Sequence, residues 1–154
     1  MTSSNNTLEL VIEVKKMLKA ANIETWIFGG WAEELLHMIP PRAHNDIDLL
    51  YLAEDFNKVD SFLLNNSECI EILPKHFHHK RAFRYKGIMI ELFLVTKNSE
   101  KHSTNFWGNI EYIWPKNTFT ENENKRIVSK DALRAFRRDH DTVKYIPEIH
   151  AVNV

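Results

Sequence analysis

The sequence predicts an α+β fold, in which helices pack on a mixed β-sheet. Amphipathic helical segments alternate with short apolar runs, and two of these runs flank a Lys-Gly turn typical of an antiparallel hairpin. A chain of 154 residues is long enough for one domain with a substantial core and short for two. We therefore expect a single domain over residues 1–154.

Hydrophobic spacing predicts the elements of the first half in order. Apolar residues at helical spacing from Leu10 to Ala21 predict a first helix, and Asn6 followed three residues later by Glu9 resembles a capping box. The elements expected next are a strand at 25–28, a helix from 31 to about 39 that a proline pair stops, a strand at about 46–52, and a helix at 54–65.

The second half is richer in strand signals. The strands expected here are 70–73, a hairpin formed by 81–85 and 88–95, and a short strand near 110–114. The polar stretch 117–125 has the composition of a loop. Ser129 is a suitable N-cap for a final helix that carries Leu133 and Phe136.

Two of the four glycines stand together where the first predicted strand meets the second predicted helix. Gly29 and Gly30 allow backbone N–H groups to approach a ligand closely, and the start of a helix offers unpaired donors and a positive dipole end. This combination predicts a turn that binds phosphate.

A pair of carboxylates begins the next predicted strand. Because residues i and i+2 of a strand point to the same side, Asp46 and Asp48 project together, while Ile47 and Leu49 point into the core. Two adjacent carboxylates repel each other unless a cation lies between them, and Mg²⁺ is the usual partner of such oxygen ligands. A phosphate-binding turn beside a metal-binding pair indicates chemistry on a nucleoside triphosphate.

A third carboxylate, Glu91, lies in the middle of an apolar strand. A buried carboxylate is costly unless it is paired or binds a cation. If this strand neighbours the strand of Asp46 and Asp48, the three carboxylates form one cluster, in which Glu91 would act as a base toward an acceptor hydroxyl or ligate a metal ion. The alternative is a salt bridge from Glu91 to Arg81 or Arg84 across the hairpin.

These motifs together resemble the nucleotidyltransferase superfamily. The residues that carry the resemblance are Gly29-Gly30-Trp31-Ala32, Glu34, Arg42, His44 and Asp46-Ile47-Asp48-Leu49. The pattern is most similar to the small antibiotic-modifying branch that includes lincosamide nucleotidyltransferases and aminoglycoside 2''-adenylyltransferase-like proteins. A fainter similarity continues through the hairpin to residues 127–131.

The resemblance implies a minimal nucleotidyltransferase fold and an adenylyltransferase-like activity. Enzymes of this kind use two Mg²⁺ ions to move a nucleoside monophosphate from ATP or another nucleoside triphosphate to a hydroxyl, releasing pyrophosphate. By this analogy Gly29 and Gly30 contact the triphosphate, Asp46 and Asp48 bind metal, and Glu91 is the base, a metal ligand, or both. We expect a small-molecule acceptor, such as an antibiotic.

The sequence departs from the family pattern at three places. Glu34 and Glu91 stand where relatives usually have aspartate, and the glycine that often ends the helix is replaced within residues 37–41. Metal binding remains compatible with these changes. The changes leave the identity of the acceptor open. One alternative is an enzyme that transfers to tRNA or protein, as in some toxin components, and another is a non-catalytic nucleotide-binding relative.

Two residues ahead of the carboxylate pair have two interpretations. Arg42 and His44 either contact phosphate oxygens or orient the loop that presents Asp46. Trp31 is assigned to the core rather than to base stacking. Glu34 is assigned to a solvated helix face, with the acceptor pocket as its alternative.

Two clusters of basic residues remain. His76, His78 and His79 lack a fourth ligand at the spacing of a zinc site, so we interpret them as an exposed loop or as a basic strand entrance near the nucleotide. A second cluster near the C-terminus would either reach the phosphates or form a solvated helix face paired with acids; its members are Arg134, Arg137 and Arg138.

Composition argues against several classes of function. A formal net charge of −1 with no long basic run gives no sign of a nucleic-acid partner, and no apolar run is long enough to span a membrane. The single cysteine, Cys69, and the lack of a signal-peptide pattern favour the cytoplasm. Three aromatics suggest either a homodimer interface or core packing, namely Phe106, Trp107 and Trp114.

Overall fold

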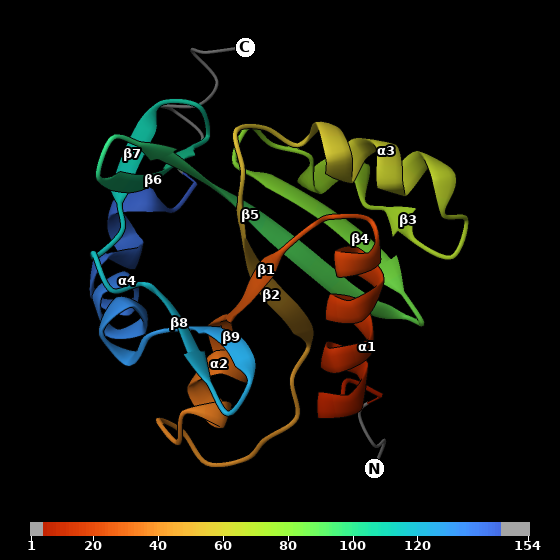
Figure 1. Ribbon diagram of the computed structural model, residues 1–154, viewed down its shortest axis with the longest axis horizontal. Coiled ribbons are helices and arrows are strands. Elements are labelled where there is room, and N and C mark those ends of the chain that lie inside the picture. The colour runs from red at the N-terminus through yellow and green to blue at the C-terminus, as the bar shows by residue number, and fades with distance from the viewer. Residues whose placement is uncertain (1–4, 146–154) are drawn as a thin grey trace.

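The computed structural model describes residues 5–145, which form a mixed sheet with helices packed on it (Figure 1). In the described part of the chain the helices are α1 (Leu8–Ala20), α2 (Gly29–Leu35), α3 (Asn57–Asn65) and α4 (Lys130–Val143), with a 3-10 turn η1 (Leu73–Lys75). The strands are β1 (Thr25–Phe28), β2 (Asp46–Leu52), β3 (Ile70–Glu71), β4 (Lys80–Tyr85), β5 (Ile88–Asn98), β6 (Lys101–Phe106), β7 (Ile110–Ile113), β8 (Phe119–Asn122) and β9 (Lys125–Val128). The predicted α+β class is confirmed.

The sheet runs in the order β3-β4-β5-β2-β1-β9-β8, and β6 and β7 extend it from the far end of β5. The β2–β5 and β1–β9 pairs are parallel, whereas the remaining pairs are antiparallel. Because β5 is 11 residues long, it pairs with β2 and β4 along its first part and with β6 along its last. This long strand joins the two parts of the sheet.

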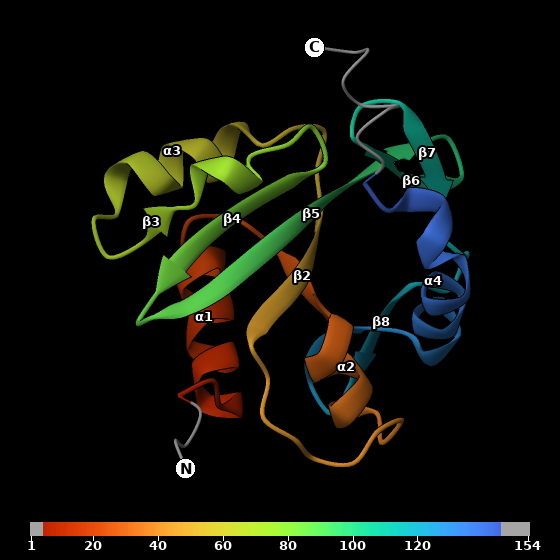
Figure 2. The ribbon, with the colours of Figure 1, turned by 180° about the vertical axis from the view of Figure 1, so that it is seen from behind.

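The helices divide the sheet into a covered face and an open face. Figures 1 and 2 show α1 and α3 on one face, whereas the opposite face of β4, β5 and β2 is open to view in Figure 2, with α2 and α4 along its side. The covered face carries the alternating apolar residues of the central strands, which are fully buried: Ile47, Leu49, Ile90 and Leu92. Alternation then places the intervening residues, including the acidic ones, on the open face.

The first helix begins differently from the prediction. Thr7, not Asn6, is the N-cap of α1, and its side chain accepts a hydrogen bond from the backbone N–H of Leu10. The Asn6–Glu9 capping box was therefore wrong. Asn6 is buried and donates to the carbonyl oxygens of His44 and Asp46 at 3.1 and 2.8 Å, so it fixes the loop that enters β2 rather than the helix.

The second helix is shorter and earlier than expected. It begins at Gly29 and ends at Leu35, five residues before Pro40. His37 adopts a positive φ of 60°, and the cap N–H of Leu36 bonds back to the carbonyl of Ala32, so the backbone turns out of the helix before the prolines. The prediction that the proline pair ends this helix was wrong, because the backbone already turns at His37, before the prolines.

Several strand boundaries also differ from the sequence-based ones. The polar stretch 117–125, predicted as a loop, contains β8 and the start of β9, which form a hairpin whose turn residues Glu123 and Asn124 both have positive φ. This hairpin adds to the edge of the sheet beside β1. No strand was expected at β6, which is a strand in the structure. The strand expected at 70–73 is shorter, since only the two residues of β3 are extended and η1 follows.

No helix among residues 5–145 is long and apolar enough to cross a membrane.

Replacing Asn6 by Ala should destabilise the protein by about 1–3 kcal/mol, because it leaves two buried carbonyl groups and the indole N–H of Trp31 without this partner. Urea unfolding measures the change. Asn5→Ala, at an exposed neighbouring position, is the matched control. Equal free energies of unfolding for the two variants would contradict this role of Asn6.

Candidate active site

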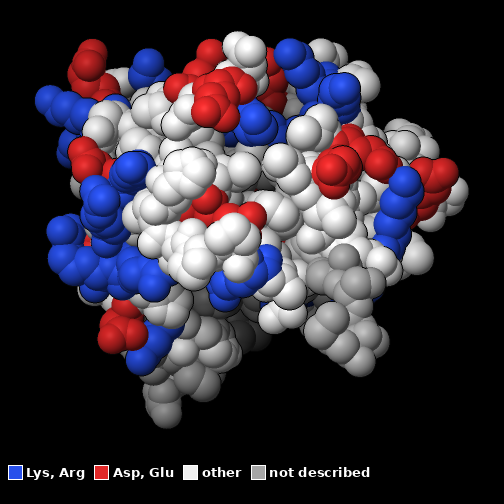
Figure 3. Space-filling view, turned by 90° about the horizontal axis from the view of Figure 1, so that it is seen from below, with Lys and Arg blue, Asp and Glu red and all other residues white. Residues whose placement is uncertain are grey.

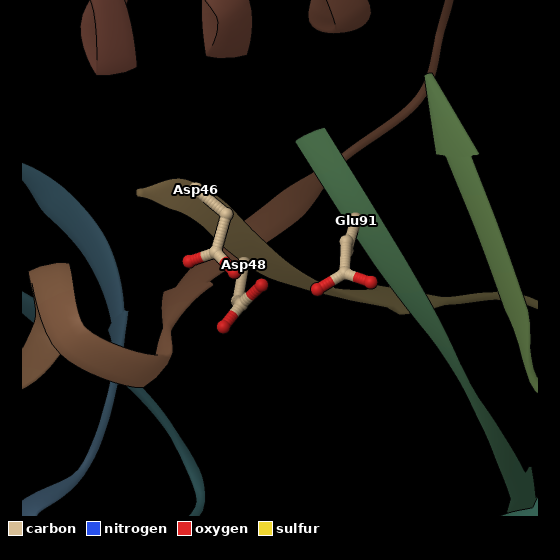
Figure 4. Close-up of side chains that lie close together, drawn as sticks. All are labelled: Asp46, Asp48 and Glu91. Carbon is tan, nitrogen blue, oxygen red and sulfur yellow. The ribbon is translucent and has the colours of Figure 1, made fainter. Parts of the chain in front are cut away.

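The parallel pairing of β2 with β5 brings three carboxylates together. Asp48 lies directly opposite Glu91 in the register, and Asp46 is two residues before Asp48 on the same face. One carboxylate oxygen from each residue lies within 4.8 Å of the other two (Figure 4). The two strands are thus neighbours, which was the condition for a three-carboxylate cluster, and the cluster lies on the face of the sheet opposite α1 and α3.

Burial makes the cluster electrostatically costly. Desolvation and the neighbouring carboxylates of Asp46 and Glu91 raise the pKa of Asp48 well above its usual range, and desolvation with Glu91 raises the pKa of Asp46. Desolvation also acts to raise the pKa of Glu91, but its ion pair with Lys80 outweighs this and lowers it. The cluster therefore favours either a proton on Asp48 or a nearby cation.

The cluster has the donor set of a hard divalent cation. All its donor atoms are carboxylate oxygens, and Oδ1 of Asp48 is buried without a hydrogen-bond partner. Oε2 of Glu91 also lacks a hydrogen bond, although Nζ of Lys80 lies 2.5 Å away in an ion pair. Three converging carboxylates, one of which has a buried oxygen without a hydrogen-bond partner, fit Mg²⁺, so Asp46, Asp48 and Glu91 are the residues that would hold it.

The glycine pair lies so close to the acids and to the loop before β2 that a residue with a Cβ would not fit at either position. Gly29 begins α2 at φ +63°, and a Cβ on it would lie 2.5 Å from Oδ2 of Asp48. A Cβ on Gly30 would lie 2.9 Å from both the guanidinium of Arg42 and Nδ1 of His44. The backbone at these positions thus comes directly beside the acids and the basic loop.

The loop between α2 and β2 is held by a carboxylate of α2. Oε1 of Glu34 lies 2.8 Å from Nε2 of His44 and accepts the backbone N–H of Arg42 at 3.1 Å. Desolvation raises the pKa of Glu34, but these two hydrogen bonds lower it overall. His44 is buried against the ring of Trp31, at 4.3 Å between centroids. This geometry supports the loop-orienting interpretation of His44, and the assignment of Glu34 to a solvated face was wrong.

A cleft of about 570 Å³ opens beside Asp48 and Gly29, between the sheet and α4. Six aromatic side chains contribute to its wall, namely Phe28, Phe93, Phe106, Trp107, Phe136 and Tyr145. Glu33 also lines it and is paired with Arg137 of α4 at 2.5 Å. The cleft is large enough for part of a nucleotide or for a small acceptor.

The histidine cluster does not form one site. His76 pairs with Glu71 at 2.7 Å, whereas His79 is buried among aromatic rings and accepts the backbone N–H of Trp107. His78 lines a separate groove on the other side of the β5 end. The exposed-loop interpretation was therefore wrong for His79, which belongs to the wall of the cleft.

The arginine cluster of α4 is mostly a paired helix face. Arg134 pairs with Asp131 and Arg138 with Asp139, whereas Arg137 reaches Glu33 at the cleft. Figure 3 shows basic groups gathered along the left flank, the side on which α4 lies in Figure 1, with acidic groups among them.

The three aromatics considered for a dimer interface pack within the fold. Phe106 and Trp114 are buried in the core, and Trp107 is partly buried and donates through Nε1 to the carbonyl of Val143. A homodimer therefore gains no support from these residues and stays a prediction.

Sequence reasoning missed four residues around the site. Lys80 and Lys75 pair with Glu91, at 2.5 and 3.6 Å, in place of the suggested Arg81 or Arg84, because Arg81 turns to Asp60. The other two are Asn6 and Glu33. The only available signal was the position of Lys80 at the start of a strand that faces Glu91.

Asp48→Asn should stabilise the metal-free protein at neutral pH by about 1–2 kcal/mol, because it removes a carboxylate charge from the cluster. Since the folded-state pKa of Asp48 is raised, its favourable contribution is present at low pH and is lost as the pH rises through that pKa. The gap between variant and wild type should thus widen as the pH rises from the acid range. Thermal unfolding in EDTA over a pH series measures the gap, and a gap that stays constant or narrows with rising pH would contradict it.

Gly29→Ala should cost stability and also displace the Asp48 carboxylate. Gly87→Ala is the matched control, because Gly87 has a φ of +79° but no atom within 4 Å of the point where a Cβ would lie. Both variants should lose about 1 kcal/mol through backbone strain, while only Gly29→Ala should weaken stabilisation by Mg²⁺. Identical Mg²⁺ titrations for the two variants would refute the close approach of Gly29 to the acids.

Comparison with known proteins agrees with this geometry. The aminoglycoside-2''-adenylyltransferase family matches the chain over residues 10–124. A comparison with curated proteins gives no significant match.

Solved structures share the fold at low identity. The lincomycin-bound lincosamide antibiotic adenylyltransferase LnuA is 17% identical, with a TM-score of 0.69 over 91% of this chain and 96% of that one. ANT(2'')-Ia in complex with adenylyl-2''-tobramycin is 16% identical, with a TM-score of 0.61 over 93% and 80%. The family match covers most of the chain, and the chain therefore belongs to the aminoglycoside-2''-adenylyltransferase family and is a nucleotidyltransferase.

Proposed function

We propose that the protein is a Mg²⁺-dependent adenylyltransferase that moves AMP from ATP to a hydroxyl of a small-molecule antibiotic and releases pyrophosphate. The observation that carries the proposal is the convergence of Asp46, Asp48 and Glu91 within 4.8 Å, directly beside Gly29. We further propose that residues 1–154 form a single nucleotidyltransferase domain that acts in the cytoplasm and pairs with a second copy of the chain in a homodimer.

The residues of the cluster divide the work. Asp46, Asp48 and Glu91 would hold Mg²⁺, and two such ions, when bound, would offset charge on the attacking and leaving oxygens of an in-line displacement. Gly29 and Gly30 would let the backbone at the start of α2 approach the triphosphate. Arg42 lies beside Gly30 and would contact a phosphate there, while His44 would fix the loop.

Glu91 is the proposed base. Its pKa is lowered, so the carboxylate is ionised at neutral pH and can accept a proton. As the acceptor oxygen bonds to the α-phosphorus, its proton passes to Glu91, and the bond from that phosphorus to the oxygen bridging the β-phosphorus breaks. Pyrophosphate leaves with the electron pair of that bond.

The cleft favours an acceptor with an apolar surface and few positive charges. Six aromatic side chains contribute to its wall, and its cationic members among the described residues include Lys80, Arg137 and Lys144. Of the carboxylates in that lining, Glu33 is already paired with Arg137, and Asp48 belongs to the metal cluster. A polycationic aminoglycoside would find no spare carboxylate there, so a lincosamide-like acceptor fits better.

Incubation with α-labelled ATP, Mg²⁺ and a panel of lincomycin, tobramycin and bulk tRNA should label lincomycin more efficiently than tobramycin and leave tRNA unlabelled. Asp48→Asn should reduce transfer at least about 100-fold, because it removes a charged metal ligand. Label on tRNA would instead favour the nucleic-acid alternative. Transfer unchanged in Asp48→Asn would overturn the assignment of the site.

A further inference from the structure

A lysine ammonium lies within the carboxylate cluster itself. Nζ of Lys80 is 2.5 Å from Oε2 of Glu91, and the Lys80 side chain is only 13% exposed. A second lysine, Lys75, lies 3.6 Å from the same oxygen but is 41% exposed. The two lysines therefore share one carboxylate oxygen, although only Lys80 is largely removed from water.

Lys80 comes from the strand next to Glu91. It starts β4, which pairs with β5 so that Lys80 lies opposite Phe93, and its ammonium is 5.3 Å from the centre of the Phe93 ring. The packed aliphatic chain directs the ammonium along the sheet toward Glu91. The same side chain lines the cleft together with Asp48 and Gly29.

One ammonium offsets only part of the charge of three carboxylates. The three carboxylates of Asp46, Asp48 and Glu91 each have an oxygen within 4.8 Å of the other two. The carboxylate that contacts Lys80 is that of Glu91. A divalent ion coordinated by Glu91 would come within a few ångströms of the ammonium, and two positive charges at that distance repel strongly in a partly buried site. The metal and Lys80 cannot both contact Glu91 favourably.

We propose that Lys80 is the internal counter-cation of the carboxylate cluster and that it competes with the metal ion for Glu91. In the absence of metal, Lys80 keeps the buried Glu91 compensated. When metal binds, the flexible four-carbon stem lets the ammonium withdraw into the adjoining cleft. There, on the basis of the function proposed above, it faces the phosphates of the nucleotide.

The test is the affinity of the purified protein for Mn²⁺ without nucleotide, measured from the free-ion signal in electron paramagnetic resonance. Lys80→Met should bind Mn²⁺ about tenfold more tightly than wild type, because the competing charge is removed. Lys80→Arg keeps the charge and should bind within about twofold of wild type. Lys75→Met, at the more exposed lysine, is the matched control and should change affinity by less than about twofold.

A second measurement separates competition from simple structural support. In EDTA, Lys80→Met should have a lower Tm than wild type, and the rise in Tm on adding MnCl₂ should be larger than for wild type. If Lys80→Met does not fold, Lys80→Gln tests the same two expectations. Mn²⁺ affinity that is unchanged or lower in the charge-removing variant would overturn the inference.

Failure of the inference is distinguishable from failure of the proposed function. Mn²⁺ binding that does not respond to Lys80→Met would overturn the counter-cation role alone. If neither wild type nor any variant binds Mn²⁺, the metal site is overturned, and with it both proposals. Tighter Mn²⁺ binding by Lys80→Met, together with no AMP transfer by wild type, would support the role of Lys80 while contradicting the proposed reaction.

Discussion

The pairing register between β2 and β5 is the constraint on which the site depends. In a parallel pair, Asp48 lies opposite Glu91, and a slip of one residue would turn one of the two carboxylates to the other face of the sheet. The register is fixed by the apolar residues between the acids, because Ile47 and Ile90 are fully buried under the helices. The hydrophobic core therefore holds together charged groups that repel each other and would otherwise move apart.

The surrounding acids show by contrast how unusual this cluster is. Glu33 is paired with Arg137, and Glu34 is bonded to His44, so each of these carboxylates on α2 has a positive or hydrogen-bonding partner. The cluster has only the lysines beside Glu91, while burial and mutual repulsion raise the pKa of Asp48. This imbalance makes the cluster a place where an added cation would lower the free energy of the folded protein.

A set of hydrogen bonds holds the loop from α2 to β2, which presents the first aspartate. Asn6 donates to the carbonyls of His44 and Asp46 and accepts the indole N–H of Trp31, so three segments distant in sequence meet at one buried amide. Glu34 closes the other side of the loop. Such buried polar contacts fix geometry that apolar packing alone leaves adjustable, and they would keep the metal ligands in place before any ion arrives.

The sequence by itself determined the α+β class, the strand–helix turn at Gly29, the paired placement of Asp46 and Asp48, and the hairpin that carries Glu91. These follow from local rules, namely glycine conformation, the two-residue period of strands and the turn chemistry of Lys-Gly. Only the tertiary structure decided which strand lies beside β2 and which cation meets Glu91, because both depend on contacts between distant segments. For the same reason local polarity misled at 117–125, where pairing with the sheet edge overrides a loop-like composition.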